Sequence, residues 1–246
     1  MSGGVPLFEV NPALDRKALA KRFARDRRIQ IRDVLTDRTA NEIRRILQHR
    51  TRWGVAWQAG ETDGPHPVSA EAMAKMTPQQ NAEIGQKLIK AMSGRDYAFV
   101  YSQFPILTAL QEKWEQGSPH ELLIEHINAD PFMSLVREVT GFSTLTKADA
   151  QATLYRPSQF LAIHDDSHVA EGWRVAYVLN MTSEEWRPEW GGYLQFYDDE
   201  GDVVAGFRPR FNSLNLFAVP QKHNVTYVAP FSPVARYAIT GWFRDW

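Results

Sequence analysis

Three residues of this chain have side chains and a spacing that suit a metal site. His164 and Asp166 are separated by one residue, and His223 follows much later in the sequence. Residues i and i+2 of a β-strand point to the same face, so His164 and Asp166 can reach one ion from a strand. Two imidazoles and one carboxylate on one face of an octahedral iron ion leave three positions open, which indicates chemistry at the metal. Zinc accepts the same ligand types.

Two neighbouring residues compete for the same role. Asp165 is the alternative carboxylate, although on a strand its side chain would point away from His164. His168 is close enough in sequence to serve as a ligand. A His-x-Asp pair alone is a weak signal, because the chain contains seven histidines and one such pair can arise by chance. The spacing therefore nominates the three residues and leaves the identity of the metal open.

The composition excludes several classes of function. The chain has 246 residues, 43% of them hydrophobic, which is enough for one sizeable core. Its formal net charge of -1 gives no support to general nucleic-acid or membrane binding. Since there is no cysteine, disulfides, thiolate metal sites and cysteine nucleophiles are excluded. No signal peptide and no membrane-spanning apolar run is visible, so we expect a cytoplasmic protein.

From about Leu14 to Gly141 the hydrophobic pattern is mainly helical. Asn11-Pro12 is expected to open the first helix. Two further helix starts are expected at Thr39 and Thr77, each followed three residues later by Glu or Gln in the form of a capping box. Short β-rich runs interrupt the helices at residues 29–35, 53–57 and 97–104, and residues 60–67 have the composition of a loop.

After Leu145 the pattern alternates with a period of two, which is typical of β-strands. We expect strands at residues 148–155, 160–165, 174–181, 193–197, 213–219, 225–228 and 235–243. Many short strands separated by turns predict a sandwich or barrel. The expected fold class is therefore α+β with a mainly β core, a double-stranded β-helix (jelly roll, cupin-like) with supporting N-terminal α-helices. We expect residues 1–246 to form a single domain, with a helix-rich supporting region at 1–145 and a catalytic core at 146–246.

From about Thr153 to Trp246 the sequence resembles the iron- and 2-oxoglutarate-dependent oxygenases of the prolyl hydroxylase type. The resemblance rests on six blocks in a specific order: LYRPSQFL (154–161), RVAYVLN (174–180), WGGYLQF (190–196), PRFNSLNLF (209–217), HNV (223–225) and RYAITGWF (236–243). The branch that hydroxylates prolines in proteins is the most similar. The resemblance implies a double-stranded β-helix with Fe(II) bound by His164, Asp166 and His223.

The resemblance also implies a binding site for 2-oxoglutarate. Arg236 matches the basic residue that holds the distal carboxylate, and a planar guanidinium can bind a carboxylate through two parallel hydrogen bonds. Tyr155 matches a tyrosine that lines the pocket, and Thr240 lies four residues beyond Arg236 on the same strand face. The chain departs from some relatives at Asn180, where they carry a tyrosine that contacts the distal carboxylate. The Asn180 amide could donate instead. Ser158 replaces a glycine that is common before the ligand strand.

The implied reaction is hydroxylation of an unactivated C–H bond with O2, giving succinate and CO2 as co-products, with ascorbate as a candidate reductant. We expect the substrate to be a prolyl residue in a protein or peptide. Two alternatives remain: a hydroxylase of the same chemistry that acts on a free amino acid or metabolite, and a non-catalytic jelly-roll binding module. The oligomeric state stays open.

Two groups of residues remain as candidates for partner binding. Arg174 and Trp190 belong to a tryptophan-rich cluster whose aromatic faces suit a proline ring; equally, such tryptophans bury large apolar areas as structure. Arg22, Arg25, Arg27 and Arg28 form a basic run. A charged helix face of this kind is usually solvated, and contact with a ribosome or another polyanion is the alternative. We expect no nucleic-acid or membrane partner from the chain as a whole.

Overall fold

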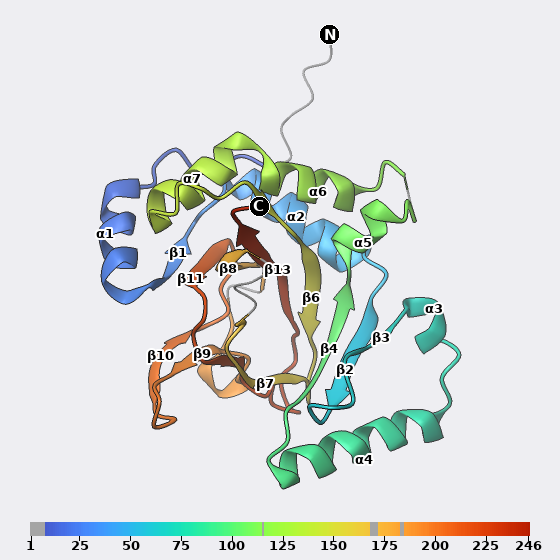
Figure 1. The fold of residues 1–246 in the computed structure, drawn as a ribbon. Coiled ribbons are helices and arrows are strands. Elements are labelled where there is room, and N and C mark those ends of the chain that lie inside the picture. The colour runs from blue at the N-terminus through green and yellow to red at the C-terminus, as the bar shows by residue number, and fades with distance from the viewer. Residues whose placement is uncertain (1–7, 115, 168–171, 183–184) are drawn as a thin grey trace.

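The computed structural model describes residues 8–114, 116–167, 172–182 and 185–246. Within these residues, thirteen strands form one antiparallel sheet that curls into a nearly closed barrel (Figure 1). The strands are β1 (Arg28–Arg32), β2 (Gly54–Ala59), β3 (His66–Val68), β4 (Ala98–Phe104), β5 (Lys147–Ala148), β6 (Gln151–Tyr155), β7 (Phe160–His164), β8 (Trp173–Asn180), β9 (Leu194–Tyr197), β10 (Val203–Phe207), β11 (Ser213–Ala218), β12 (His223–Val225) and β13 (Arg236–Arg244).

The strand order brings distant parts of the sequence together. The main path runs β1-β11-β8-β13-β6-β4-β7-β12-β9-β10, with β2 on β4, β3 on β2 and β5 on β13. Strands β7 and β12, which carry the two histidines of interest, are neighbours in this path. Strands β1 to β4 come from the region expected to be helical support, yet they join the same sheet. The boundary expected between residues 145 and 146 stays a prediction.

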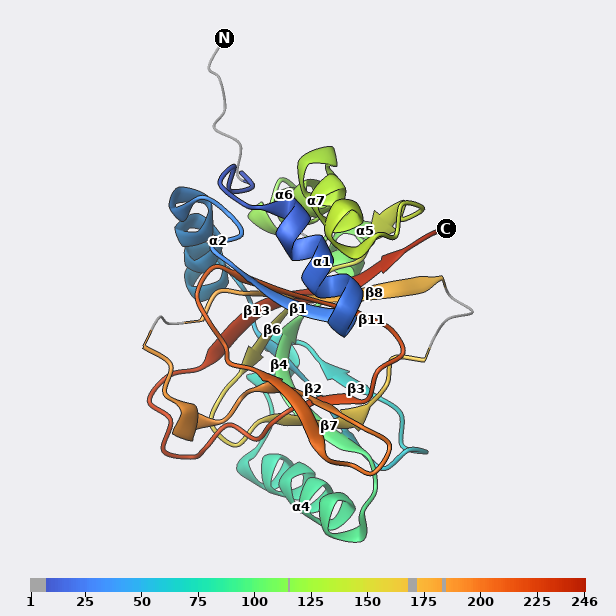
Figure 2. The same ribbon diagram turned by 90° about the vertical axis from the view of Figure 1, so that its left-hand side faces the viewer.

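Most helices lie together on one face of the sheet. They are α1 (Arg16–Asp26), α2 (Asp37–His49), α3 (Ala70–Met73), α4 (Pro78–Gly94), α5 (Ile106–Gln111), α6 (Pro119–Asn128) and α7 (Asp130–Thr140). Figures 1 and 2 show α1, α2, α5, α6 and α7 gathered over one face of the sheet, with α4 at the opposite end. Within the described residues, no helix is long and apolar enough to cross a bilayer.

Strand alternation divides the core into two layers. On β8, Val175, Tyr177 and Leu179 pack under the helices in the largest apolar cluster. Their neighbours Ala176 and Val178 point to the other face, into the barrel, and pack with Ala238 of β13. Because β8 is covered on both faces, it is apolar along most of its length. The expected α+β class with a double-stranded β-helix core is confirmed.

Several local expectations were wrong, each for a physical reason. Helix α1 begins at Arg16 with Asp15 as its N-cap, because Asn11 closes a turn by accepting from the Ala13 amide. Helix α2 begins at Asp37, and Thr39 lies inside it, where its hydroxyl accepts from the Glu9 amide. The capping box at Thr77 is confirmed.

Two strands, β3 and β10, were not predicted from the sequence. Strand β3 begins at the end of the loop expected at residues 60–67 and pairs with β2. Strand β10 is mostly exposed and contains Gly206, so it lacks the alternating apolar pattern; its pairing with β9 defines it.

Candidate metal centre

Two histidines face each other across neighbouring strands. His164 ends β7, His223 begins β12, and the two are directly paired in the antiparallel register. Their ring centroids are 4.2 Å apart. The Asp166 carboxylate lies between them, with Oδ1 3.4 Å from His164 Nε2 and Oδ2 3.4 Å from His223 Nε2. The candidate ligand atoms of all three residues lie within 4.8 Å of one another, so they could hold one ion.

The backbone turn after β7 places Asp166. The strand ends at His164, and Asp166 has a left-handed conformation with φ of 56°. Our explanation from strand alternation was therefore wrong, because a turn and not the pleat brings the carboxylate to the histidines. A non-glycine residue in this conformation costs about 1–3 kcal/mol and often marks a functional site. Asp165 instead accepts from the Ser167 amide at 3.1 Å and stabilises the turn. His168 lies outside the described residues.

Backbone carbonyls orient both imidazoles. His164 Nδ1 lies 3.0 Å from Ala162 O, and His223 Nδ1 lies 2.7 Å from Gln221 O. A carbonyl can only accept, so each Nδ1 carries the proton and donates. With Nδ1 engaged in this way, Nε2 is the atom of each ring that points toward Asp166 and that can bind a metal once it carries no proton.

Trp242 of β13 completes the support of the carboxylate. Its indole Nε1 donates to Asp166 Oδ2 at 3.0 Å. Its ring stacks on Trp173, with centroids 4.0 Å apart and an interplanar angle of 13°. Trp242 was not predicted as a site residue; its place two residues beyond Thr240, on the same face of β13, was the available signal.

Burial and mutual charge determine the protonation of the three side chains. Burial, helped by the charge of His164, lowers the pKa of His223 to about 4, so this ring is neutral at pH 7. Burial also disfavours a charged His164, but the hydrogen bond and charge of Asp166 outweigh it and raise its pKa. For Asp166 itself, burial is outweighed by the hydrogen bond from His164 and the charges of both histidines, so its pKa is lowered. The carboxylate is therefore ionised.

The cluster lies in a pocket of about 450 Å³ inside the barrel, and Arg236 lines the same pocket. Only 2% of Arg236 is exposed, and its Nε and Nη1 have no hydrogen-bond partner among the described residues. Its guanidinium carbon sits 5.2 Å from the centroid of the Tyr155 ring. Burial lowers its pKa to about 10, so it stays charged at neutral pH. A buried, unpaired cation is costly, and the pocket is therefore complementary to an anion.

The structure brings some of the other nominated residues to this pocket. Tyr155 and Thr240 line it. Asn180 is fully buried on the strand face that Ala176 and Val178 share, but it does not line the pocket. Its Nδ2 donates to Val178 O at 3.3 Å, while its Oδ1 has no partner within the described chain.

Arg174 and Trp190 do not line the pocket. Arg174 forms an ion pair with Asp245 at 2.6 Å. Trp190 packs edge-on against Trp186, 5.6 Å between centroids, in a small apolar cluster that also contains Tyr155. Residues that sequence reasoning missed in the pocket include Tyr97, Phe99 and Tyr101 of the β4 region, for which no motif gave a signal.

Comparison with known proteins agrees with this geometry. Residues 150–244 match the family model of the 2OG-Fe(II) oxygenase superfamily. The sequence matches no curated protein. The resemblance to 2OG-Fe(II) oxygenases is confirmed.

Solved structures share the fold at low identity. A prolyl-4-hydroxylase from Pseudomonas putida is 16% identical with a TM-score of 0.57, over 96% of this chain and 94% of that chain. A prolyl hydroxylase from Trichoplax adhaerens, solved with a peptide fragment of the hypoxia inducible factor oxygen degradation domain, is 16% identical with a TM-score of 0.54, over 94% and 89%. The alpha-ketoglutarate-dependent epimerase SnoN of nogalamycin biosynthesis is 15% identical with a TM-score of 0.55, over 96% and 84%.

Proposed function

We propose that this chain, which carries a 2OG-Fe(II) oxygenase domain, is an Fe(II)- and 2-oxoglutarate-dependent dioxygenase that hydroxylates a prolyl residue in a protein or peptide. The observation that carries the proposal is Arg236, an unpaired guanidinium buried in the same pocket as the His164, Asp166 and His223 cluster. A dicarboxylate that also chelates a metal needs these two features at the two ends of one pocket. No structural role within the described residues accounts for a bare buried cation.

The three ligand residues fit iron. Two neutral imidazole nitrogens and one carboxylate suit a divalent first-row metal and leave three positions for other ligands. With 2-oxoglutarate and O2, bound iron supplies the oxidising chemistry at the C–H bond. Asp166 would contribute the one anionic ligand, and the Trp242 hydrogen bond restricts its rotation. The carbonyls of Ala162 and Gln221 hold the imidazole tautomers that coordination needs.

Arg236 would bind the distal carboxylate of 2-oxoglutarate. Its unpaired Nε and Nη1 groups offer charge-assisted hydrogen bonds, which are worth roughly 1.5–3 kcal/mol each. The Tyr155 ring lies against the guanidinium and fixes its plane, and Thr240 adds a hydroxyl to the same pocket. Asn180 stays a candidate contact of the same carboxylate through its amide, although it does not line the pocket.

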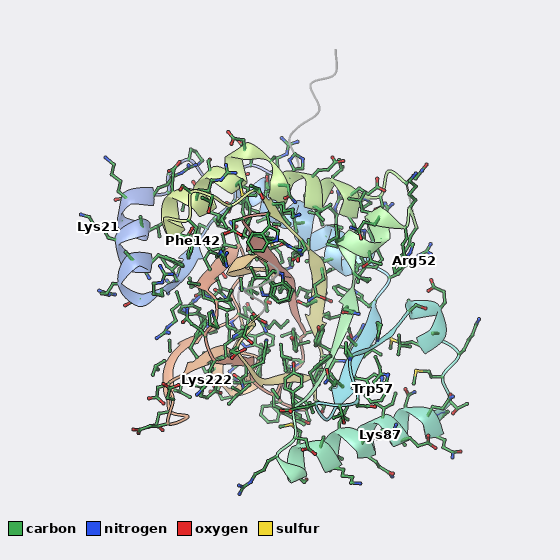
Figure 3. All side chains as sticks on the ribbon, in the orientation of Figure 1. Lys21, Arg52, Trp57, Lys87, Phe142 and Lys222 are labelled. Atoms are coloured by element: carbon green, nitrogen blue, oxygen red, sulfur yellow. The ribbon has the colours of Figure 1, made fainter. Side chains whose placement is uncertain are left out.

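A groove that leads away from the pocket favours a polypeptide over a small molecule. It has a volume of about 790 Å³ and shares Pro65, Phe99 and Tyr101 with the metal pocket. It continues past Phe104 and Trp114 to the helices α3, α5 and α6. Arg52, labelled in Figure 3, also lines this groove. Aromatic grooves of this kind accommodate extended, proline-containing segments, whereas a free amino acid would need only the inner pocket.

The proposal is tested by incubating the purified protein with Fe(II), 2-oxoglutarate and a library of proline-containing peptides. We expect succinate release and the gain of one oxygen atom by a peptide, measured by mass spectrometry and mapped to proline. Succinate release with oxygen gain only by free amino acids or metabolites would support the small-molecule hydroxylase instead. If the protein released no succinate and showed no metal-dependent binding of 2-oxoglutarate, the result would support the non-catalytic binding module.

A further inference from the structure

A second groove, on the side of the barrel where the first and last strands of the sheet path approach each other, is lined by arginines. Arg22 comes from α1, Arg32 ends β1, and Arg208 and Arg210 follow β10. The groove has a volume of about 760 Å³. It shares no lining residue with the metal pocket. We call the groove lined by these four residues the arginine groove. It is separate from the proposed catalytic centre.

The positive charge of the arginine groove is only partly compensated. No carboxylate among the described residues forms an ion pair with any of the four arginines. Asp15 is the one acidic residue of the lining, and its Oδ1 is engaged by the Ala18 amide at the start of α1. Burial lowers the pKa of Arg210, and the positive charges of Arg208 and Arg32 lower it further. An anion in the groove would relieve this repulsion.

The arginines at the base of the groove are held in place before any ligand binds. Gln30 Oε1 accepts from Arg210 Nε at 3.0 Å. Gln30 Nε2 donates to Arg208 O and to the buried Asn215 Oδ1, both at 3.0 Å. Arg208 Nε is shielded from solvent and has no partner among the described residues. The Arg210 guanidinium is thus held by Gln30, and the Arg208 backbone beside it is fixed by the same side chain, which lowers the entropy cost of binding an anion.

The basic run of the sequence does not act as one surface. Only Arg22 lines the groove. Arg25 pairs with Asp26, and Arg28 donates to Gln221. Arg27 lies over the Phe142 ring, 5.1 Å from its centroid. The cationic site therefore comes from residues that are distant in sequence, and a search for basic runs could not find it.

We propose that the arginine groove binds a ligand with consecutive phosphate groups. Guanidinium groups present paired N–H donors that match phosphate oxygens, and arginine is the preferred residue for such recognition. Four cations spread along one groove suit a series of charges more than a single small anion. The same chemistry is offered by free polyphosphate and by the backbone of single-stranded RNA, against which the Tyr193 ring of the lining could stack a base.

The test measures binding of three probes to the full-length protein at about 50 mM salt, where phosphate contacts are strong. The probes are inorganic tripolyphosphate by calorimetry, a fluorescent single-stranded RNA oligomer by anisotropy, and a glutamate oligomer of matched charge by anisotropy. We expect tripolyphosphate to bind and the glutamate oligomer to bind at least about tenfold more weakly, a difference of about 1.4 kcal/mol. RNA binding tighter than tripolyphosphate identifies a nucleic-acid backbone as the source, and the reverse order identifies free polyphosphate.

Variants locate the site. Arg208→Gln/Arg210→Gln should weaken binding of the favoured probe at least about tenfold, and for RNA should reduce the slope of log K against log salt by about 1.4, at roughly 0.7 per lost phosphate contact. Arg32→Gln changes an exposed side chain, so it tests the site without risk to the fold. Arg45→Gln/Arg50→Gln, on α2 and at its C-cap, removes the same charge elsewhere and should bind like the wild type. Absence of tripolyphosphate and RNA binding by the wild type, equal losses in the control, or equal binding of the glutamate oligomer would overturn the proposal.

Discussion

The Trp242 indole donates to Asp166 Oδ2 at 3.0 Å and so ties the last strand of the sheet to the turn that carries the carboxylate. Asp166 is also the residue that bridges the two histidines. Because its backbone is in a left-handed conformation outside any strand, these side-chain contacts are what fix its position. The three-residue cluster thus depends on a residue that is not itself a ligand.

Removal of this hydrogen bond should loosen the metal site. In Trp242→Phe the ring can still stack on Trp173, but the donor to Asp166 is lost. Loss of such an outer hydrogen bond typically weakens metal affinity about 10- to 100-fold. We expect a decrease in this range in Fe(II) or Co(II) titrations, while Trp190→Phe, outside the pocket, should titrate like the wild type. Equal affinities for Trp242→Phe and the wild type would show that the hydrogen bond does not support the ligand.

The two adjacent aspartates should differ sharply. Asp166→Ala removes the one anionic member of the cluster and should reduce iron retention by at least about 100-fold, since the loss of a charged ligand exceeds that of an outer contact. Asp165→Ala removes only a hydrogen bond to the Ser167 amide, so its iron content should stay near that of the wild type. Iron content after desalting, measured by elemental analysis, checks both. A larger loss in Asp165→Ala would reassign the carboxylate ligand.

Arg236→Gln should separate co-substrate binding from metal binding. The glutamine keeps hydrogen-bonding capacity but removes the charge and the paired donors, so we expect the 2-oxoglutarate requirement to rise by roughly 100-fold, or about 3 kcal/mol. Iron affinity should be unchanged. Arg187→Gln, which removes an exposed arginine, serves as the matched control in succinate-release assays. An unchanged requirement in Arg236→Gln would move the distal carboxylate site elsewhere.

Metal binding should depend on pH mainly through His164. The pKa of His223 is lowered to about 4, so this ring needs no deprotonation at neutral pH. The pKa of His164 is raised, and its proton must leave before a metal binds. Affinity for Co(II) should therefore fall as the pH drops through the raised pKa of His164, with a slope of one proton per metal until His223 also protonates. A slope of two protons starting near neutrality would contradict this assignment.

A bulky residue in the outer groove should separate peptide oxidation from consumption of 2-oxoglutarate. Thr108 of α5 lines the groove but not the metal pocket. Thr108→Trp should raise the KM for a peptide substrate by about tenfold or more, the equivalent of about 1.4 kcal/mol, and leave succinate release without peptide unchanged. Ile89→Trp, on an exposed position of α4, is the control for the added ring. An unaffected peptide KM would place the polypeptide elsewhere.

Much of the fold could be predicted from the sequence, because alternation of apolar and polar residues with a period of two predicts strands directly. It placed β8 and β13 within a residue or two, since both are long and regular. It missed β10, which is exposed and depends on its partner strand. In the site, residue types and spacing nominated His164, Asp166 and His223, but the reason given for Asp166 failed, because the strand ends at His164 and Asp166 has a left-handed backbone that the strand pattern did not predict. The pocket tyrosines and the arginine groove required the strand order, which brings together residues distant in sequence.

The central claim is that one pocket binds the metal and 2-oxoglutarate together, and calorimetry of 2-oxoglutarate binding under anaerobic conditions tests it most directly. Titrations would compare the metal-free protein, the Fe(II)-loaded protein, Asp166→Ala and Arg236→Gln. We predict tight binding only to the Fe(II)-loaded wild type, with weaker binding when either the metal or the Arg236 charge is absent. Binding of 2-oxoglutarate that is equally tight without metal, or unchanged in Arg236→Gln, would contradict the account.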